Sequence, residues 1–400
     1  MPLKEFKCKV CDSAALEEIL HFDELHRVTS DCLPFRQGGR LAVCTLCGAA
    51  QALADGKWLS DIAEIYGKYE IYHQSGGVEQ QVFDSESGRL RRRSDVLLDR
   101  VFSQPNVPNS GKVLDIGCGA GGTLRTFAER GRWILHGAEM DERNLPLLAP
   151  IPGFQKLYTC DAKEIPDTFE IITMVHSLEH VLEPTDLLSD LRGKLAPDGR
   201  LVIQVPNAAL NPFDYVVADH MIHFSPDPLA NLLRRSGFVV EYLSTAWIPK
   251  EISVVARVAM EPLTVNWKAA SADVVGQVGW LRELVKEAKT IAEGPDSVPF
   301  GLFGSSIAAA WLWQAVRDRV TFFVDQDSSR VGKEYLGLPV LSPSQVPPGA
   351  IVFVPLAPQL AGIIEQQLQG LPIDLRLPPP VASASNDSAI PANIRIPPVS

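Results

Sequence analysis

The sequence predicts an α/β protein with a Rossmann-like core, preceded by a small metal-binding module and followed by a smaller α/β domain. Three observations favour this fold class. Strand-like apolar runs alternate with helix-like runs from residue 112 to about residue 260, which indicates a mostly parallel sheet covered by helices on both faces. Two C-x-x-C pairs lie within the first 60 residues, and a second alternating unit begins near residue 299.

The composition is that of an ordinary globular chain. Hydrophobic residues make up 46% of the 400 residues and charged residues 21%, which is typical neither of a membrane protein nor of a disordered one. The net charge of −11 argues against a nucleic-acid partner, because phosphate backbones favour clustered Lys and Arg. No apolar run reaches the ~18 residues of a membrane span, and the N-terminus lacks the apolar segment of a signal peptide. We therefore expect a cytoplasmic protein, a monomer or homodimer, with neither a membrane nor a nucleic acid as partner.

Periodicity and composition divide the chain into six regions. Helical spacing of apolar residues dominates the second and fourth regions, whereas the last is rich in Pro, Ser and Ala. The regions that we expect are a zinc-binding module (1–60), a helical connector or lid (61–105), the main α/β core (106–262), a connecting helix (263–295), a smaller α/β domain (296–376) and an unstructured tail (377–400).

Four cysteines predict a structural zinc site. Cys8 and Cys11 form one C-x-x-C pair, and Cys44 and Cys47 form the second. Four thiolates at about 2.3 Å complete a tetrahedral shell around Zn²⁺, which leaves no open position for catalysis. Two redox-active pairs, or plain buried thiols, are the alternative interpretation.

The stretch KVLDIGCGAGG, residues 112–122, predicts a strand that ends at an acid and turns through glycines into a helix. Glycines let the backbone approach a ligand closely, and ligands of open α/β sheets bind beyond the carboxyl ends of the strands. A dinucleotide site would have G-x-G-x-x-G, whereas the spacing here is D-x-G-x-G-x-G. A carboxylate at Asp115 would repel a pyrophosphate but suits the ammonium and sulfonium groups of S-adenosylmethionine.

Two further acids follow the next strands and support this cofactor. Glu139 is placed to bind the ribose hydroxyls, and Asp161 to receive the adenine amino group. The predicted cofactor-binding residues are Asp115, Gly117, Cys118, Gly119, Gly121, Glu139, Met140, Asp161, Ala162 and His176.

Residues 105–260 resemble the S-adenosylmethionine-dependent class I methyltransferases, with MVHSLEHVLEP and LAPDGRLVIQVPN following the cofactor motifs. The three-part chain further resembles the zinc-containing sugar C-methyltransferases, which act on nucleotide-linked keto-deoxysugars. This resemblance implies a class I methyltransferase core and a small-molecule acceptor such as a nucleotide-linked sugar. Two segments differ from that group: V-A-D-H at 217–220 replaces Y-H-E-H, and FGLFGSS at 300–306 lacks the group's lysine.

Histidines after two of the predicted strands indicate the acceptor site. His176 and His180 bracket HSLEH, and His220 lies in a segment inserted after the next strand, where loops commonly carry function. Methylation of a carbon beside a ketone needs a general base, and imidazole suits this role near neutral pH. We predict His220 as the base, with Asp219 to orient or tune the site and His180 as the second candidate.

Other residues are predicted to close the site or contact the acceptor. Tyr72 is expected to close over the sulfonium end of the cofactor. In the second α/β unit, a glycine followed by serines could cradle a phosphate. The predicted substrate-binding residues are His223, Gly304, Ser305 and Ser306.

Together these features predict an S-adenosylmethionine-dependent C-methyltransferase of a nucleotide-linked keto-deoxysugar or a related small molecule, with a histidine base. An O- or N-methyltransferase of another small metabolite is the first alternative. A non-catalytic zinc-containing scaffold is the second.

Overall fold

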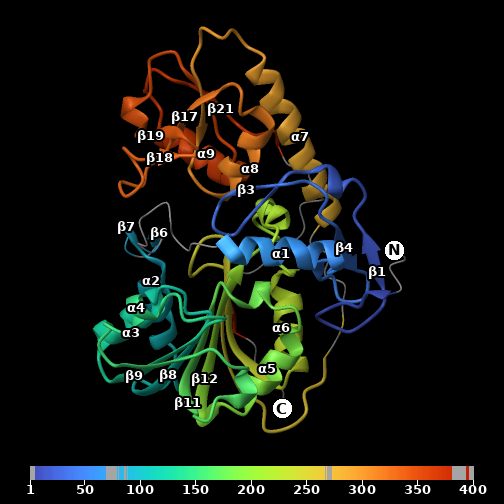
Figure 1. Ribbon diagram of the computed structural model, residues 1–400, viewed down its shortest axis with the longest axis vertical. Helices are drawn as coiled ribbons and strands as arrows, with labels where there is room; N and C mark the ends of the chain where they lie inside the picture. The colour runs from blue at the N-terminus through green and yellow to red at the C-terminus, as the bar shows by residue number, and fades with distance from the viewer. Residues whose placement is uncertain are drawn as a thin grey trace.

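The computed structural model describes residues 5–68, 79, 81–84, 87, 89–265, 267, 273–380 and 393–395. It has three parts, and the N-terminal module lies between the central sheet and the C-terminal domain (Figure 1). No helix in these described ranges is both long enough and apolar enough to cross a bilayer.

The central part is a Rossmann-like sheet, as predicted from the sequence. Its strand order is β10–β9–β8–β11–β12–β15–β14–β22, and the first five run parallel while β15 is antiparallel to both of its neighbours. Because parallel strands end at one edge, the loops after these strands meet there. The strands are β8 (Gly111–Ile116), β9 (Trp133–Ala138), β10 (Phe154–Tyr158), β11 (Phe169–Val175), β12 (Leu195–Pro206), β14 (Phe238–Ser244), β15 (Glu251–Val258) and β22 (Asn393–Arg395).

Helices cover both faces of this sheet (Figure 1). Successive residues of β8 enter opposite cores, since Val113 packs in the cluster of α2 and α3 whereas Leu114 packs in that of α5 and α6. This alternation explains why the strands read as continuous apolar runs. The helices are α2 (Arg93–Phe102), α3 (Gly122–Arg130), α4 (Leu145–Leu148), α5 (Pro184–Arg192) and α6 (Pro226–Arg235).

The N-terminal module shares a sheet with the core. Its strands β1, β4 and β5 are completed by β13, which belongs to the segment inserted after β12. The module is therefore built onto the predicted acceptor segment. Its elements are β1 (Leu16–Glu18), β2 (Arg27–Val28), β3 (Pro34–Phe35), β4 (Leu41–Cys44), β5 (Ala50–Ala52), α1 (Gly56–Lys68) and the added β13 (Ile222–His223).

The connector is not wholly helical, contrary to our expectation for residues 61–105. A hairpin of β6 (Gln81–Asp84) and β7 (Arg89–Arg92) lies between α1 and α2. Arg91 pairs with Asp84 of β6 and Asp99 of α2, and Arg92 pairs with Asp95 of α2 and Glu129 of α3.

The C-terminal domain is a second α/β sheet with the order β18–β19–β17–β16–β20–β21, parallel except for β18. Helix α7 precedes it, within the expected connecting region. We expected the tail to be unstructured. Its described residues 393–395 instead form β22, which pairs with β14. The domain's elements are α7 (Val274–Ala292), β16 (Phe300–Phe303), α8 (Ile307–Val316), β17 (Val320–Val324), β18 (Glu334–Tyr335), β19 (Leu338–Leu341), β20 (Ile351–Phe353), α9 (Pro358–Gln367) and β21 (Asp374–Arg376).

Candidate active site

The glycine loop follows β8 and opens α3. Gly117, Gly119 and Gly121 have φ angles of 70°, 49° and 82°, a region that disfavours residues with a side chain. A Cβ on Gly117 would lie 2.7 Å from the Cβ of Ser177, so the glycine also permits close contact with the loop after β11. The loop is thus shaped by glycine, as expected of a turn that admits a ligand to its backbone.

Two predicted cofactor acids lie at this loop. Asp115 is 3% exposed and accepts a hydrogen bond from Oγ1 of Thr173 at 2.6 Å. Burial raises the pKa of Asp115 to about 7, the negative charges of Glu139 and Glu79 add to the rise, and the Thr173 hydrogen bond opposes it. Glu139 accepts a hydrogen bond from the backbone N–H of Gly119 at 2.7 Å. A cation near Asp115 would relieve the cost of this buried carboxylate.

The remaining predicted cofactor residues are placed less uniformly. Cys118 is buried, and its sulfur packs against Gly137, so its thiol lies in the core. Met140 follows β9 and is 74% exposed. Asp161 follows β10 and is exposed beside Lys163, 3.3 Å away, while Ala162 begins a short 3-10 helix. The exposed side chains mark the rim of the site.

His176 lies in an ion-pair cluster between loops. Its Nδ1 is 3.3 Å from Glu179 and its Nε2 is 3.3 Å from Glu251. Burial alone would lower the pKa of His176, but the carboxylates of Glu251 and Glu179 outweigh burial and raise it, against the opposing charge of Arg93. We did not predict Glu179 or Glu251 as site residues. Glu179 could have been found from its i+3 spacing in HSLEH, whereas β15 brings Glu251 in from far along the chain.

A buried carboxylate holds His220 and His223 together. Asp214, in the 3-10 helix η6 (Pro212–Val216), is 2% exposed, and each of its oxygens accepts from one Nδ1 at 2.9 Å. Burial would lower the pKa of His220, but Asp214, and then Glu179 and Asp219, outweigh burial and raise it to about 9. Because Nδ1 is engaged, the opposite nitrogen, Nε2, is the atom that can exchange a proton.

Asp219, predicted to orient or tune the site, bonds to Ser30 and His180 rather than to His220, although its charge raises the pKa of His220. Its carboxylate accepts from the backbone N–H of Ser30 at 2.8 Å and from the Ser30 hydroxyl at 2.5 Å. Its backbone carbonyl accepts from Nδ1 of His180 at 2.9 Å, and its carboxylate lies 3.4 Å from the same nitrogen. Asp219 therefore acts on His180, and Asp214 takes the place beside His220.

Both predicted catalytic histidines meet at one point. The rings of His180 and His220 pack edge to face with centroids 4.8 Å apart. Glu179 lies beside them, with its ligand-capable atom and theirs all within 4.8 Å of one another. Burial would raise the pKa of Glu179, but the nearby His176, His180 and His220 outweigh burial and lower it.

Direct contacts join these histidines to the cofactor loop. The N–H of Met221 donates to the carbonyl of Glu179 at 2.7 Å, which ties the 219–223 segment to the loop after β11. That loop in turn touches Gly117 through Ser177. The segment that carries His220 and His223 is therefore linked, through the loop after β11, to the turn at Gly117. Tyr72 lies outside the described residues.

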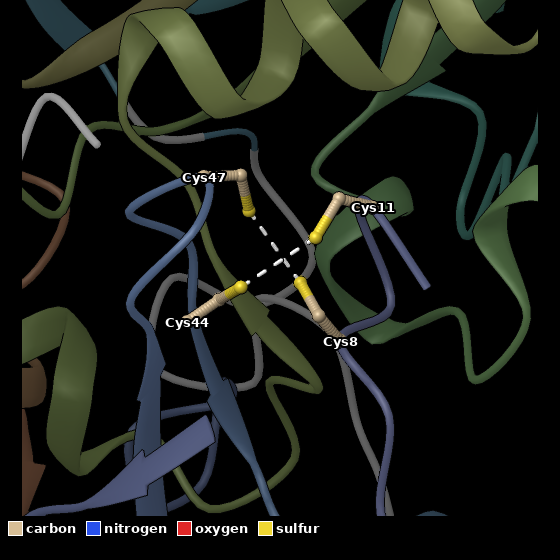
Figure 2. Close-up of side chains that lie close together, drawn as sticks. All are labelled: Cys8, Cys11, Cys44 and Cys47. Atoms are coloured by element: carbon tan, nitrogen blue, oxygen red, sulfur yellow. Dashed lines mark hydrogen bonds between the residues drawn. The ribbon is translucent and has the colours of Figure 1, made fainter. Parts of the chain in front are cut away.

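The four paired cysteines converge on one point (Figure 2). Two sulfur–sulfur distances are 3.5 Å, Cys8 to Cys47 and Cys11 to Cys44, and all four sulfurs lie within 4.8 Å of one another. Tetrahedral thiolates at 2.3 Å from a metal would be about 3.8 Å apart. The donor set and spacing therefore fit a closed Zn²⁺ site.

The serine loop of the C-terminal domain is already satisfied by an acid. Gly304 has a φ of 88°, and the N–H and hydroxyl of Ser305 both donate to Asp325, at 3.0 and 2.6 Å. Ser305 is thus not available as the predicted phosphate contact, because the half-buried carboxylate of Asp325 accepts from both of its donors. Ser306 begins α8 as its N-cap residue.

Comparison with known proteins supports the assignment of the core. Residues 88–243 match the family model described as a methyltransferase domain. The ubiquinone biosynthesis O-methyltransferase of Roseobacter denitrificans is 28% identical over 205 residues, covering 43% of this chain and 77% of that protein. The mitochondrial enzyme of the same name from Schizosaccharomyces pombe is 26% identical over 183 residues, covering 40% and 67%. The core is an S-adenosylmethionine-dependent methyltransferase domain.

Solved structures that resemble the chain do so at low scores. The glycopeptide N-methyltransferase MtfA, complexed with S-adenosylmethionine, has a TM-score of 0.34 and 19% identity, covering 41% of this chain and 94% of that one. The mitomycin 7-O-methyltransferase MmcR has a TM-score of 0.37 and 20% identity, covering 42% and 54%.

Proposed function

We propose that the methyltransferase domain transfers the methyl group of S-adenosylmethionine to an acidic hydroxyl of a small molecule, with His220 as general base. The observation that carries this proposal is the Asp214–His220 pair, on a segment bonded to the loop after β11, which in turn packs on the glycine loop. A carboxylate on one ring nitrogen of a histidine orients the other and stabilises the ring after it has accepted a proton. His180 then contributes a second ring to the acceptor pocket.

The pKa of His220 suits an oxygen acceptor. A general base must be basic enough to accept the proton of the acceptor, and a phenolic hydroxyl has a pKa of about 10. With a pKa of about 9, the neutral ring of His220 is basic enough for this, and the share of molecules with a neutral ring grows as the pH rises toward 9. The two curated relatives described above are both named O-methyltransferases, which supports the same choice.

For the cofactor we propose that Asp115 pairs with a cationic group of S-adenosylmethionine and Glu139 with the ribose hydroxyls. Asp161, at the rim, would receive the adenine amino group. The N–H of Gly119 now bonds to Glu139, so cofactor binding would share that carboxylate with the loop. We also propose that Cys8, Cys11, Cys44 and Cys47 hold a structural Zn²⁺.

Methylation at carbon beside a ketone of a nucleotide-linked sugar is the second candidate. The observation that favours it is the architecture, because the four-cysteine module and the C-terminal α/β domain flank the core as in the sugar C-methyltransferases that the sequence resembles. The same histidine would then remove a proton from carbon.

A methyl-transfer assay tests both candidates. Purified protein is incubated with S-adenosylmethionine and either 3,4-dihydroxybenzoate or a nucleotide-linked 4-keto-6-deoxysugar, and S-adenosylhomocysteine and methylated product are measured by mass spectrometry. Exchange of the sugar's α-proton in deuterium oxide separates methylation at carbon from methylation at oxygen.

His220→Gln should abolish the transfer, while His21→Gln, an exposed histidine of the N-terminal module, should leave it unchanged. Full activity of His220→Gln would refute the base. A protein that binds S-adenosylmethionine yet turns over neither acceptor would favour the scaffold alternative.

A further inference from the structure

We propose that the four-cysteine module positions the catalytic histidines of the acceptor site, with Ser30 and Gln51 as its positioning residues. The inference rests on the proposed function, because it concerns the same histidines. Two separate routes of contact carry it.

The first route runs through Ser30 to His180. The carboxylate of Asp219 is fully buried, and Ser30 donates to both of its oxygens. The carbonyl of Asp219 holds the ring of His180, which packs edge to face on His220. A serine 189 residues away in the sequence therefore fixes the residue that orients this ring.

The backbone on either side of Ser30 strengthens this route. The N–H of Ala218 donates to the carbonyl of Val28 at 2.7 Å, and Val28 forms a β-bridge with Val217. Residues 28–30 of the module thus hold residues 217–219 by main-chain and side-chain bonds together.

The second route runs from the cysteines through Gln51 to His223. Gln51 is buried, and its side chain accepts from the N–H of Lys9 at 2.8 Å and donates to the carbonyl of Lys7 at 3.1 Å, the two neighbours of Cys8. In the shared sheet, Gln51 pairs with Ile222, and Ala50 pairs with His223. His223 shares Asp214 with His220. The strand that carries His223 is therefore held in position by β5, whose Gln51 bonds to both neighbours of Cys8.

These contacts predict a separation of functions. The cofactor loop and its acids follow β8 and β9 of the core. The loop should therefore still bind its ligand when the contacts of Ser30 or Gln51 are removed. Misplacement of a catalytic group by about 1 Å costs up to about 100-fold in rate. Loss of either positioning residue should therefore lower kcat without weakening the binding of S-adenosylhomocysteine.

The test compares Ser30→Ala with Ser13→Ala. Ser13 is a serine of the same module whose hydroxyl accepts only a local bond, from the N–H of Ala15 at 3.1 Å. Ser30→Ala should lower kcat by about 10- to 100-fold with the Kd for S-adenosylhomocysteine within twofold, and Ser30→Thr, which keeps the hydroxyl, should recover most of the rate. Gln51→Ala should lower kcat similarly while keeping one equivalent of zinc by elemental analysis.

A second measurement needs no acceptor. Ring proton NMR of the eight histidines should show the His180 and His220 signals shifted in Ser30→Ala and unchanged in Ser13→Ala. Unchanged kcat and unchanged ring signals in Ser30→Ala would overturn the inference. So would equal losses of S-adenosylhomocysteine affinity and kcat, because they would indicate general unfolding. An active His220→Gln would instead refute the proposed function.

Discussion

Replacement of Asp214 by Asn should show how much the negative charge of this side chain, rather than its size, contributes to the pKa of His220 and to activity. Asn keeps the size of the side chain but removes the charge that holds His220 and His223 at 2.9 Å each. The amide can accept a hydrogen bond through one oxygen only. At least one of the two histidines then loses its acceptor.

The structure gives the size of the effect. The pKa of His220 rises from its ordinary value of 6.5 to about 9, with Asp214 as the main cause opposing burial. At about 1.4 kcal/mol per pKa unit, this rise corresponds to about 3 kcal/mol in favour of the charged ring. Because the folded-state pKa is raised, this stabilisation is complete below pH 6.5 and is lost as the pH rises through 9. Without the carboxylate of Asp214, the pKa of His220 should fall, because only the charges of Glu179 and Asp219 then oppose burial.

Two assays check this. In the wild-type protein, kcat/KM should rise with pH up to about 9, as His220 loses its proton and becomes a base. In Asp214→Asn the rise should end at a lower pH than in the wild type, and the plateau should be lower by about 10²- to 10⁴-fold. Urea denaturation should show the variant less stable by about 3 kcal/mol at pH 6, with a smaller difference at pH 9.5.

Asp198→Asn, at an exposed aspartate, is the matched control. An unchanged pH profile in Asp214→Asn would refute the assignment of Asp214 as the partner of the base.

Three further predictions concern the cofactor and the metal. Asp115→Asn should weaken S-adenosylhomocysteine binding at least tenfold by calorimetry, and wild-type binding should strengthen as the pH rises through about 7, where the carboxylate ionises; pH-independent binding would contradict this role. Gly117→Ala should weaken the same binding more than Gly131→Ala, because both have positive φ but only the first would meet a neighbouring side chain; equal effects would leave backbone strain as the sole cause. Cys47→Ser should lose the single zinc equivalent expected by elemental analysis, whereas Cys160→Ser, at an exposed cysteine, should keep it; a metal-free, folded wild-type protein would refute the zinc site.

Local patterns predicted the core of this protein well. The alternation of strands and helices followed from apolar periodicity, and the turn at Gly117 followed from glycine's freedom at positive φ. The positions of Asp115 and Glu139 beside the loop followed from a topological rule, since parallel strands end at one edge. Each C-x-x-C pair places two thiols on one turn, and the pairing of β1 with β4 brings the two turns together.

The connector shows where apolar periodicity failed. We expected residues 61–105 to be helical, but residues 89–92 form strand β7, which pairs with β6. Pairing with another strand leaves no signal in the spacing of apolar residues. The sequence likewise did not predict the acid that bonds to Ser305, since Asp325 lies at the end of β17, 20 residues away.

The sequence by itself predicted the glycine loop, the acids that follow its neighbouring strands and the two C-x-x-C pairs, because each of these depends on residues close together in the chain or at the ends of adjacent strands. Only the tertiary structure decided the acceptor side. Asp214 reaches His220 and His223 at spacings of six and nine residues, which match neither a helix nor a strand, while Ser30 reaches Asp219 from another module. Tertiary packing, both within the inserted segment and between it and the N-terminal module, brings these charged groups together. No periodic pattern in the sequence links them.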